Sequence, residues 1–430
     1  MESPLVRGGL TIVAGVLTGN LLGFVRVAVT AYLLGTHSRA DTLAVAMGPI
    51  DTLNAVLINS IVFAFVPLLA ASEERRVALF RQLHRLFSWV FLAVAFFLMA
   101  TAPWLMRALA PGLDPQYFDS AVTLFRIFAL STLAAGTAAL YCALLYTDRR
   151  FAPTAFYAAA INVCTVAGAL ALWRMLGIYG FAIGYTTGAF SQLAIVWFAT
   201  RRDLAGQPDS AEGGLTVREI LAKPAFFVIY ATGIGLNMTF TRAWATHAGP
   251  GMAAAFDYCL RGVSVPLALL VNPISNSLLP EIARLRALFR WREAFRLIDR
   301  TIALTALVAV VGCAFALVFR QPAIAIMFQR GEFHRESTLL VSAVFLGLGP
   351  SIVGWSLMEI SARSLFALDR PWPPVVAALV PLLVNVIFTV SWHSHRPEWL
   401  GFGSTIGLVV GFLTLFVLAH SGRRRWLAGQ

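Results

Sequence analysis

The stretch Gly23-Phe24-Val25-Arg26 places an arginine inside an apolar segment near the start of the chain, and Asp41 follows it. The stretch Phe240-Thr241-Arg242, followed by Asp257, repeats the aromatic residue, the arginine and the aspartate at a constant offset of 216 residues. A charge within a membrane-length apolar segment costs about 2.5 to 3.5 kcal/mol on insertion scales. Because the chain carries such a charge at two corresponding places, the repeat predicts a duplicated membrane protein whose halves face each other across a polar site.

Composition supports a polytopic membrane protein. Of 430 residues, 59% are hydrophobic and 13% are charged, and the mean hydropathy is +0.76, whereas soluble proteins average roughly 45 to 50% apolar and 25% charged residues. The net charge of +12 is spread over short loops instead of one face, which argues against nucleic acid as a partner. Most basic residues fall in alternate loops beginning with the N-terminus, so the positive-inside rule predicts that both termini are cytoplasmic.

Apolar runs bounded by Pro, Gly or charges predict an all-α protein of about twelve transmembrane helices. A polar stretch at the midpoint predicts an N-terminal six-helix lobe at 1–200, a cytoplasmic linker at 201–223 and a C-terminal six-helix lobe at 224–430. With six spans each, the lobes should be related by a pseudo-two-fold axis along the membrane normal. The expected spans are 8–34, 41–70, 86–109, 121–146, 154–174, 179–199, 225–246, 253–280, 301–319, 337–366, 373–392 and 401–420.

In each half of the chain, one arginine-rich segment follows the second span. Residues 73–85 include Arg81 and Arg85, and residues 281–300 hold six arginines among apolar residues. Both segments are typical of amphipathic helices that lie on the cytoplasmic leaflet with arginines toward anionic headgroups. Flanking cations also fix topology without binding anything, and this second interpretation stays open.

Charged residues within the expected spans are the candidate site residues. Asp257 and Arg261 are four residues apart on one helical face, as are Glu359 and Arg363, so each pair can be a structural ion pair. The full set is Arg26, Asp51, Arg126, Arg242, Asp257, Arg261, Glu359 and Arg363, with Asp41 at the outer start of the second span.

Three of these cations, Arg26, Arg126 and Arg242, have no acid within a helical turn. Unless an acid such as Asp51 reaches them from another helix, they should face a water-filled cavity or an anionic ligand. Arginine suits phosphate because its planar guanidinium donates two parallel hydrogen bonds and stays charged. Asn20 and Asn54 add polar groups to the same spans, either to line the cavity or to join helices by hydrogen bonds.

No sequence pattern indicates catalysis. The chain contains no P-loop, HExxH or GxSxG motif, and its four cysteines show no CxxC spacing. We therefore expect a transporter without enzymatic activity, cofactor or metal site, driven by the membrane potential, an ion gradient or the gradient of its substrate.

The chain resembles the MurJ/MviN-type lipid II flippases of the multidrug/oligosaccharidyl-lipid/polysaccharide exporter superfamily. The resemblance rests on short motifs in order along the chain. They are Leu22-Gly23-Phe24-Val25-Arg26, Ala40-Asp41, Ala64-Phe65-Val66-Pro67, Arg261 five residues before Pro266, Leu279-Pro280, and Phe328-Gln329-Arg330-Gly331-Glu332-Phe333.

The resemblance implies a MATE-like pair of lobes around a cationic cavity. Through it, an undecaprenyl-diphosphate-linked sugar would move from the inner to the outer leaflet of the bacterial inner membrane by alternating access. By this resemblance Arg26 and Arg261 would bind the diphosphate. The polarity of the spans, independently of the resemblance, adds Arg242, Asp257, Asn20 and Asn54 as residues expected in the cavity. Asp41 would help to gate the outer side, and membrane lipids and cell-envelope synthesis proteins would be partners.

This sequence also departs from the family. The family commonly has an arginine at the position of Asn20, an acid at Val27, arginines near Leu53 and Asn54, and two further C-terminal helices. Fewer cations should weaken binding of a diphosphate, so a flippase for another lipid-linked oligosaccharide of an exported polysaccharide is an alternative. A cation-coupled drug exporter and a non-transporting scaffold of a cell-envelope complex are further alternatives; a drug exporter should carry more acids in its cavity than this chain does.

Overall fold

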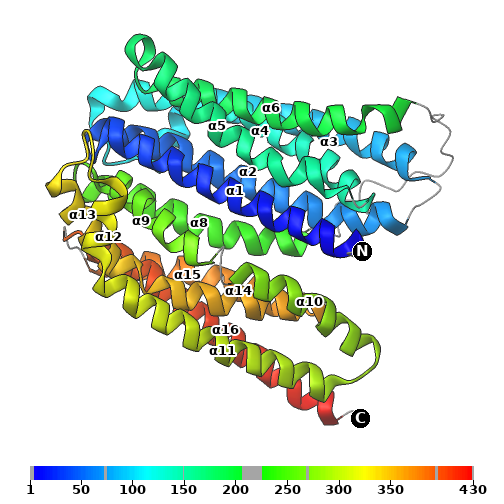
Figure 1. Ribbon diagram of the computed structural model, residues 1–430. Coiled ribbons are helices and arrows are strands. Elements are labelled where there is room, and N and C mark those ends of the chain that lie inside the picture. Colours follow the sequence, from blue (N-terminus) through cyan, green and yellow to red (C-terminus); the bar gives the residue numbers. More distant parts are fainter. Residues whose placement is uncertain are drawn as a thin grey trace. The chain divides into compact units, whose positions relative to one another are not determined.

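The computed structural model describes residues 4–71, 75–148, 150–205, 225–267, 271–392 and 396–428, and these residues form fifteen α-helices, one short 3-10 helix and no strand (Figure 1). The helices are α1 Pro4–Leu34, α2 Ser38–Ala71, α3 Arg76–Leu109, η2 Pro115–Tyr117, α4 Phe118–Thr147, α5 Phe151–Leu176, α6 Tyr179–Ala205, α8 Ala225–Ala248, α9 Met252–Pro266, α10 Asn272–Ala287, α11 Trp291–Val318, α12 Arg320–Phe328, α13 Arg335–Leu348, α14 Ser351–Ala367, α15 Trp372–Ser391 and α16 Trp399–Ala428.

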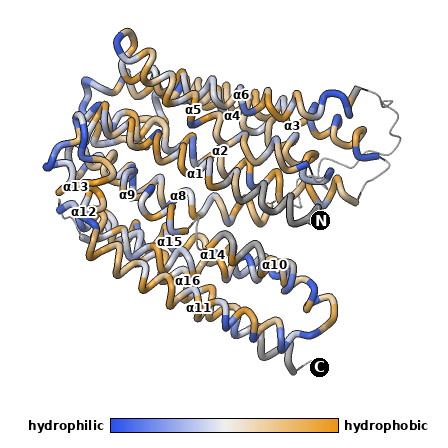
Figure 2. The backbone as a smooth tube through the Cα atoms, in the orientation of Figure 1, coloured by the Kyte–Doolittle hydropathy of each residue, from blue (hydrophilic) through white to orange (hydrophobic). Residues whose placement is uncertain are grey.

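Nine of the described helices are long and apolar enough to cross a membrane, or up to ten if the bent pair α13 and α14 counts as one span. Figure 2 shows hydrophobic residues along the helices and hydrophilic ones gathered near helix ends and in loops. Each expected span contains a helix, and the all-α polytopic fold is confirmed.

Two expected spans are interrupted in the structure. The span expected at 253–280 is divided into α9 and α10, and residues 268–270 between them lie outside the described part of the chain. The span expected at 337–366 bends by 45° between α13 and α14. Pro350 lies at this bend, and proline lacks the N–H that would continue the helical hydrogen bonds.

Three further details differ from the expectation. The short helix α12 was not expected, and Pro322 lies in its first turn, where a missing N–H costs little. The arginine-rich segments are not separate surface helices either. Residues 76–85 are the first turns of the continuous helix α3, and residues 281–300 form the end of α10, a turn and the start of α11.

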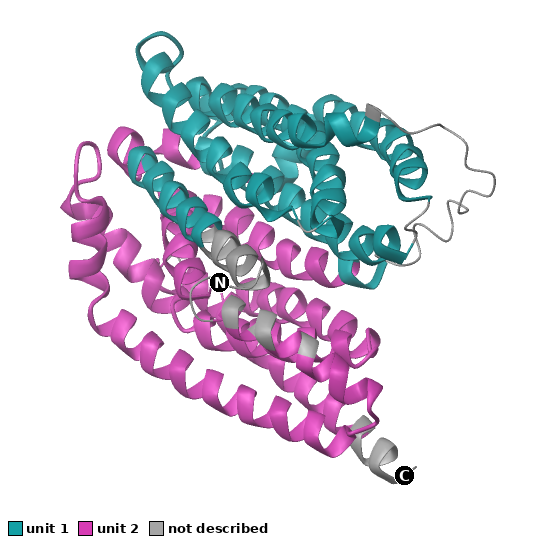
Figure 3. Ribbon diagram, turned by 45° about the vertical axis from the view of Figure 1, so that its right-hand side comes forward, with its two compact units in different colours: residues 1–30, 42–109, 113–228 teal, residues 31–41, 110–112, 229–430 magenta. Residues whose placement is uncertain are grey.

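The chain divides into two compact units (Figure 3). Unit 1 comprises residues 1–30, 42–109 and 113–228, and unit 2 comprises residues 31–41, 110–112 and 229–430. Two short segments from the first half of the chain thus belong to unit 2. Residues 206–223, most of the expected linker at 201–223, lie outside the described residues, so the lobe boundaries at 200 and 224 stay a prediction.

Unit 1 is built on α4, which packs against both α3 and α6, and on the close pair of α5 and α6. Aromatic and aliphatic side chains of α2, α3 and α4 form a core that includes Phe65, Leu83 and Phe91. Gly184 of α6 lies against the backbone of α5, where an added Cβ would collide with the carbonyl group of Cys164. Small residues at such positions let helix backbones approach closely in membranes.

Unit 2 contains a buried network of uncharged polar groups between α8, α15 and α16. The Asn385 Nδ2 atom donates to Asn237 Oδ1 and to Thr241 Oγ1, each at 2.8 Å. The Asn237 Nδ2 atom donates to Ser404 Oγ at 2.9 Å. Asparagine within membrane helices commonly joins helices by hydrogen bonds, and Asn237 and Asn385 do so here.

Replacing Asn385 with alanine should destabilise unit 2, because two buried acceptors on α8 would lose their donor. Leaving buried polar groups unpaired costs about 1 to 3 kcal/mol. We expect a clear drop in the midpoint of thermal unfolding in detergent. The control is Asn59→Ala, at an exposed position of α2, for which the midpoint should hardly move; equal midpoints for the two variants would contradict the role of the network.

Candidate functional site

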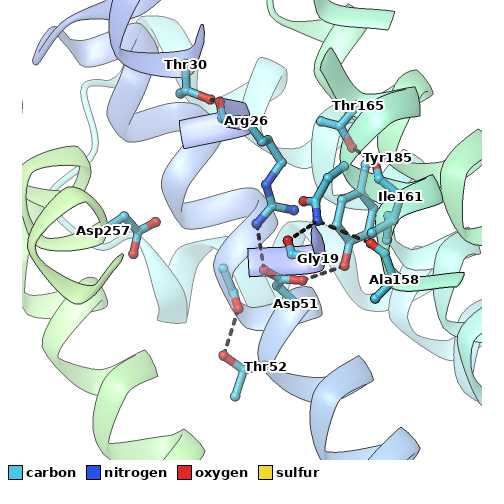
Figure 4. A network of polar contacts seen from close by, with 12 residues as sticks. Gly19, Arg26, Thr30, Asp51, Thr52, Ala158, Ile161, Thr165, Tyr185 and Asp257 are labelled. Carbon is cyan, nitrogen blue, oxygen red and sulfur yellow. Dashed lines mark hydrogen bonds and ion pairs between the residues drawn. The ribbon is translucent and has the colours of Figure 1, made fainter. Parts of the chain in front are cut away.

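In unit 1, Arg26 of α1, Asp51 of α2 and Tyr185 of α6 form a polar cluster (Figure 4), in which the Asp51 side chain is 45% exposed. Arg26 Nη2 lies 3.4 Å from Asp51 Oδ2, and the Tyr185 hydroxyl donates to Asp51 Oδ1 at 2.7 Å. The Arg26 guanidinium also lies over the Tyr185 ring, 5.9 Å from its centroid. The ion pair is long, whereas the bond from the buried tyrosine to the aspartate is short.

The other candidate site residues of unit 1 differ in burial and in their hydrogen-bond partners. Asn54 is buried and its Nδ2 atom donates to Ser131 Oγ of α4 at 2.9 Å, which is a bond between helices. Arg126 is exposed on α4 and its Nε atom donates to the Met99 carbonyl group of α3 at 3.2 Å. Asn20 is half-buried on α1. The structure therefore does not bring Arg126 into the cluster around Arg26.

In unit 2, Arg242 of α8 binds Asp257 of α9 tightly. Arg242 Nε and Nη2 lie 2.8 and 2.7 Å from Asp257 Oδ1, and the guanidinium lies over the Phe256 ring. The Arg242 side chain is only 5% exposed, against 28% for Asp257. Arg261 is half-buried one turn further along α9.

For Arg26 and Arg242 these pairs bear out the alternative in which an acid from another helix reaches the arginine, as considered for Asp51. Each contacts an acid from a neighbouring helix, a pairing that spacing along one helix does not reveal. Asp257 binds Arg242 of α8 through Oδ1, so its carboxylate serves a neighbouring helix, and its pairing with Arg261 along α9 stays a prediction. Glu359 and Arg363 do pair along one helix, with Arg363 Nε 2.6 Å from Glu359 Oε1, and the Tyr230 hydroxyl donates to Glu359 Oε2 at 3.2 Å.

Asp41 lies at the start of α2 and caps the N-terminus of α9. Its Oδ2 atom accepts from the Gly251 N–H at 2.5 Å and its Oδ1 atom from the Ala254 N–H at 2.8 Å. The first N–H groups of a helix have no partner within the helix, and an aspartate that accepts from them stabilises the helix end. Gly251 has φ +83°, a conformation that favours glycine.

The remainder of segment 31–41 is held to unit 2 by further bonds. The Tyr258 hydroxyl donates to the Gly35 carbonyl group at 2.8 Å, and the Glu332 N–H donates to the Tyr32 carbonyl group at 2.9 Å. The hydroxyl groups of Thr36 and Ser337 lie 2.7 Å apart. The loop between α1 and α2 is thus an integral part of unit 2.

The two copies of the arginine–aspartate repeat make different contacts in the structure. Arg242 binds the aspartate fifteen positions after it, whereas the corresponding Asp41 binds backbone groups of α9. Sequence reasoning also missed Tyr185 and Tyr258. Both lie in apolar helices, where the only signal is a hydroxyl group that needs a partner when it is buried.

Comparison with known proteins agrees with this architecture. A model of the family described as lipid II flippase MurJ matches residues 30–427. The chain belongs to the MurJ family of lipid II flippases. Related family members include the probable lipid II flippase MurJ of Rhizobium meliloti (strain 1021), 26% identical over 97% of this chain and 82% of the relative. The lipid II flippase MurJ of Burkholderia cenocepacia is also 26% identical, over 96% of this chain and 84% of the relative.

Solved structures share the fold. Lipid II flippase MurJ in an inward closed conformation superimposes with a TM-score of 0.83 at 18% identity, covering 96% of this chain and 87% of that one. An inward-facing MATE family multidrug resistance transporter of the MOP superfamily gives a TM-score of 0.80 at 11% identity, covering 95% and 96%. The family resemblance and the MATE-like fold are both confirmed.

Proposed function

We propose that this chain is a non-enzymatic flippase that moves a polyprenyl-diphosphate-linked sugar, of the lipid II type, between the leaflets of the bacterial inner membrane. Membership of the MurJ family carries the proposal, because the relatives that match almost the whole chain are named lipid II flippases. The arginines within the apolar helices support it chemically, since a diphosphate needs fixed cations to enter a low-dielectric region.

Arg26 is the residue that we propose to bind the diphosphate in unit 1. Its contact with Asp51 is a single one at 3.4 Å, while the other oxygen of Asp51 is held by Tyr185 at 2.7 Å. A phosphoryl group can accept two parallel bonds from one guanidinium. The substrate can therefore displace Asp51, which keeps Tyr185 as its partner when Arg26 turns away.

In unit 2, Arg261 is the better candidate for substrate contact and Arg242 has a positioning role. Arg242 is almost fully buried and bonded through two nitrogens to Asp257. Breaking this pair would leave a buried charge without its partner, which costs about 3 to 5 kcal/mol. Arg242 therefore keeps Asp257 in place, and the more accessible Arg261 offsets the charge of the substrate.

Segment 31–41 is the gate in this proposal. Its bonds to α9 and to the loop before α13 hold it on unit 2, and alternating access requires a state in which it is released. In this proposal the hydrogen bonds of the segment are broken and re-formed in each cycle. Both termini are cytoplasmic, and the membrane potential or an ion gradient supplies the energy.

Native mass spectrometry of the purified protein with its co-purifying lipids tests the substrate class. We expect a polyprenyl-diphosphate-linked saccharide on the wild-type protein, whose mass identifies the sugar. The double variant Arg26→Ala/Arg261→Ala should lose it, since each charge-assisted hydrogen bond contributes about 1.5 to 3 kcal/mol.

The matched control is Arg174→Ala, at an exposed position in the last turn of α5, which should retain the lipid. A different lipid-linked oligosaccharide on the wild type would assign the flippase to an exported polysaccharide. Only bulk phospholipid on the wild type, or equal amounts of polyprenyl-diphosphate lipid on wild type and double variant, would contradict the proposal.

A further inference from the structure

A cavity of about 420 Å³ opens on unit 1, away from the cluster of Arg26 and Asp51, between the first turns of α3, the C-terminal part of α4 and the end of α6. The wall contributed by α3 carries Arg81, His84, Arg85 and Ser88, and Trp89 lies at its edge. No acid is among the described residues that line it. The cavity is therefore positively charged and open.

The polar groups of the wall are of two kinds: some already have a hydrogen-bond partner in the protein, and others have none among the described residues. Arg81 Nη2 donates to the Leu204 carbonyl group in the last turn of α6 at 2.6 Å, which fixes its charge at the cavity. His84 Nε2 lies 3.2 Å from the Tyr141 hydroxyl. By contrast, Arg85 is exposed and has no hydrogen bond or ion pair to any described residue, and the Ser88 hydroxyl is buried without a described partner.

An acceptor-only anion matches this set of donors. Buried hydroxyl groups usually have a partner, and the Ser88 hydroxyl has none among the described residues, so we take it as a donor available to an acceptor in the cavity. A phosphate diester carries one negative charge and only acceptor oxygens, and arginine binds phosphate well. Phosphate chemistry therefore fits the cavity better than a cation or a neutral apolar group does.

The surface of α3 that continues from the cavity toward the C-terminal end of the helix favours a lipid as the source of such a phosphate. Residues Arg85, Trp89, Leu92 and Phe96 are spaced so that they share one face of the helix, and Trp89, Leu92 and Phe96 are 69, 43 and 72% exposed. At 1.5 Å per residue this face runs roughly 16 Å from Arg85 to Phe96. One leaflet of hydrocarbon is about 15 Å thick. The face is therefore long enough for one acyl chain to lie along it from the headgroup level to the bilayer centre.

We propose that this cavity binds the phosphate of an anionic glycerophospholipid, with Arg85 and Ser88 donating to the phosphate and an acyl chain lying along Trp89, Leu92 and Phe96. Arg81 contributes charge while it stays bonded to α6. Tryptophan is enriched at the level of lipid headgroups, which agrees with the place of Trp89 between the cations and the apolar face. The site is independent of the transport substrate and belongs to unit 1 alone.

Native mass spectrometry with defined lipids tests this site. The wild-type protein, delipidated in detergent, is titrated with palmitoyl-oleoyl phosphatidylglycerol, with the phosphatidylcholine of the same chains, and with inorganic phosphate. We expect one phosphatidylglycerol to bind at least about tenfold more tightly than phosphatidylcholine, because the arginines repel the choline cation. Arg85→Gln should remove most of this preference, whereas Ser88→Ala should weaken the binding of both lipids, which share the phosphate. Arg174→Gln removes an equal charge from an exposed position elsewhere and should preserve the preference.

Three results would overturn the assignment. Equal preference for phosphatidylglycerol in the wild type and in Arg85→Gln would show that the cavity is not the site. Displacement of the lipid by an equal concentration of inorganic phosphate would reduce the site to one for a free anion. Displacement by an equal concentration of a polyprenyl diphosphate would make it a second site for the transport substrate.

Discussion

The variant Asp41→Ala is expected to release segment 31–41 from unit 2 and to reduce transport. Its carboxyl group accepts from the N–H groups of Gly251 and Ala254, and alanine accepts from neither. Removing a helix cap costs about 0.5 to 2 kcal/mol, and buried N–H groups left without a partner add about 1 to 3 kcal/mol. The released population should therefore rise at least about tenfold.

Labelling of a cysteine at position 40 measures this release. Ala40 is buried at 2% exposure, so in a background whose four native cysteines are replaced, Ala40→Cys reacts with a water-soluble maleimide only when the segment leaves unit 2. We expect at least about tenfold faster labelling when Asp41→Ala is added, and an intermediate rate with Asp41→Asn, which retains one acceptor.

The control for this experiment is Asp119→Ala. Asp119 is an exposed acid in the first turn of another helix, α4, so its removal should leave the labelling rate unchanged. If Asp41→Ala and Asp119→Ala give the same rate, the cap does not hold the segment.

The variant Arg26→Ala should lose transport by at least tenfold while the protein stays folded. Arg26 lies in a cluster with Asp51 and Tyr185, and Asp51 keeps its hydrogen bond from Tyr185 when the arginine is removed. Arg26→Lys should recover part of the activity, because lysine keeps the charge but cannot donate two parallel bonds to one phosphoryl group.

The measurement is the rate at which a polyprenyl-diphosphate-linked saccharide becomes accessible on the far leaflet of reconstituted vesicles. Thermal unfolding in detergent reports whether each variant is folded, and Arg174→Ala serves as the matched loss of an exposed arginine. Wild-type transport in a folded Arg26→Ala protein would show that this residue does not bind substrate.

Much of the fold follows from the sequence because a bilayer demands long apolar helices. Each expected span therefore contains a helix in the structure, although the curated relatives are only about a quarter identical to this chain. The broken span at Pro350 and the short helix α12 were missed, because a proline is equally compatible with a kink inside a span and with an end of it. The arginines of α3 were assigned to a surface helix because polar residues extend the helix beyond its apolar part.

The candidate site was only partly predictable. Charge within apolar segments is rare and costly, so Arg26, Arg242 and Asp257 stand out in the sequence. Which acid pairs with which arginine does not follow from the sequence, because the contact of Arg26 with Asp51 depends on how α1 and α2 pack, and periodicity along one helix carries no such information. Equal spacing was also misleading for Asp41, whose bonds go to backbone N–H groups that the sequence cannot distinguish from others.

The place of segment 31–41 in unit 2 also has a consequence for how the protein is made. Asp41 is synthesised long before Gly251 and Ala254, the residues to which it binds. At about 5 to 20 residues per second, roughly 10 to 40 s separate them. During that interval the start of α2 has no partner from α9, so the first half of the nascent chain must wait in the membrane, incomplete, until the second half arrives.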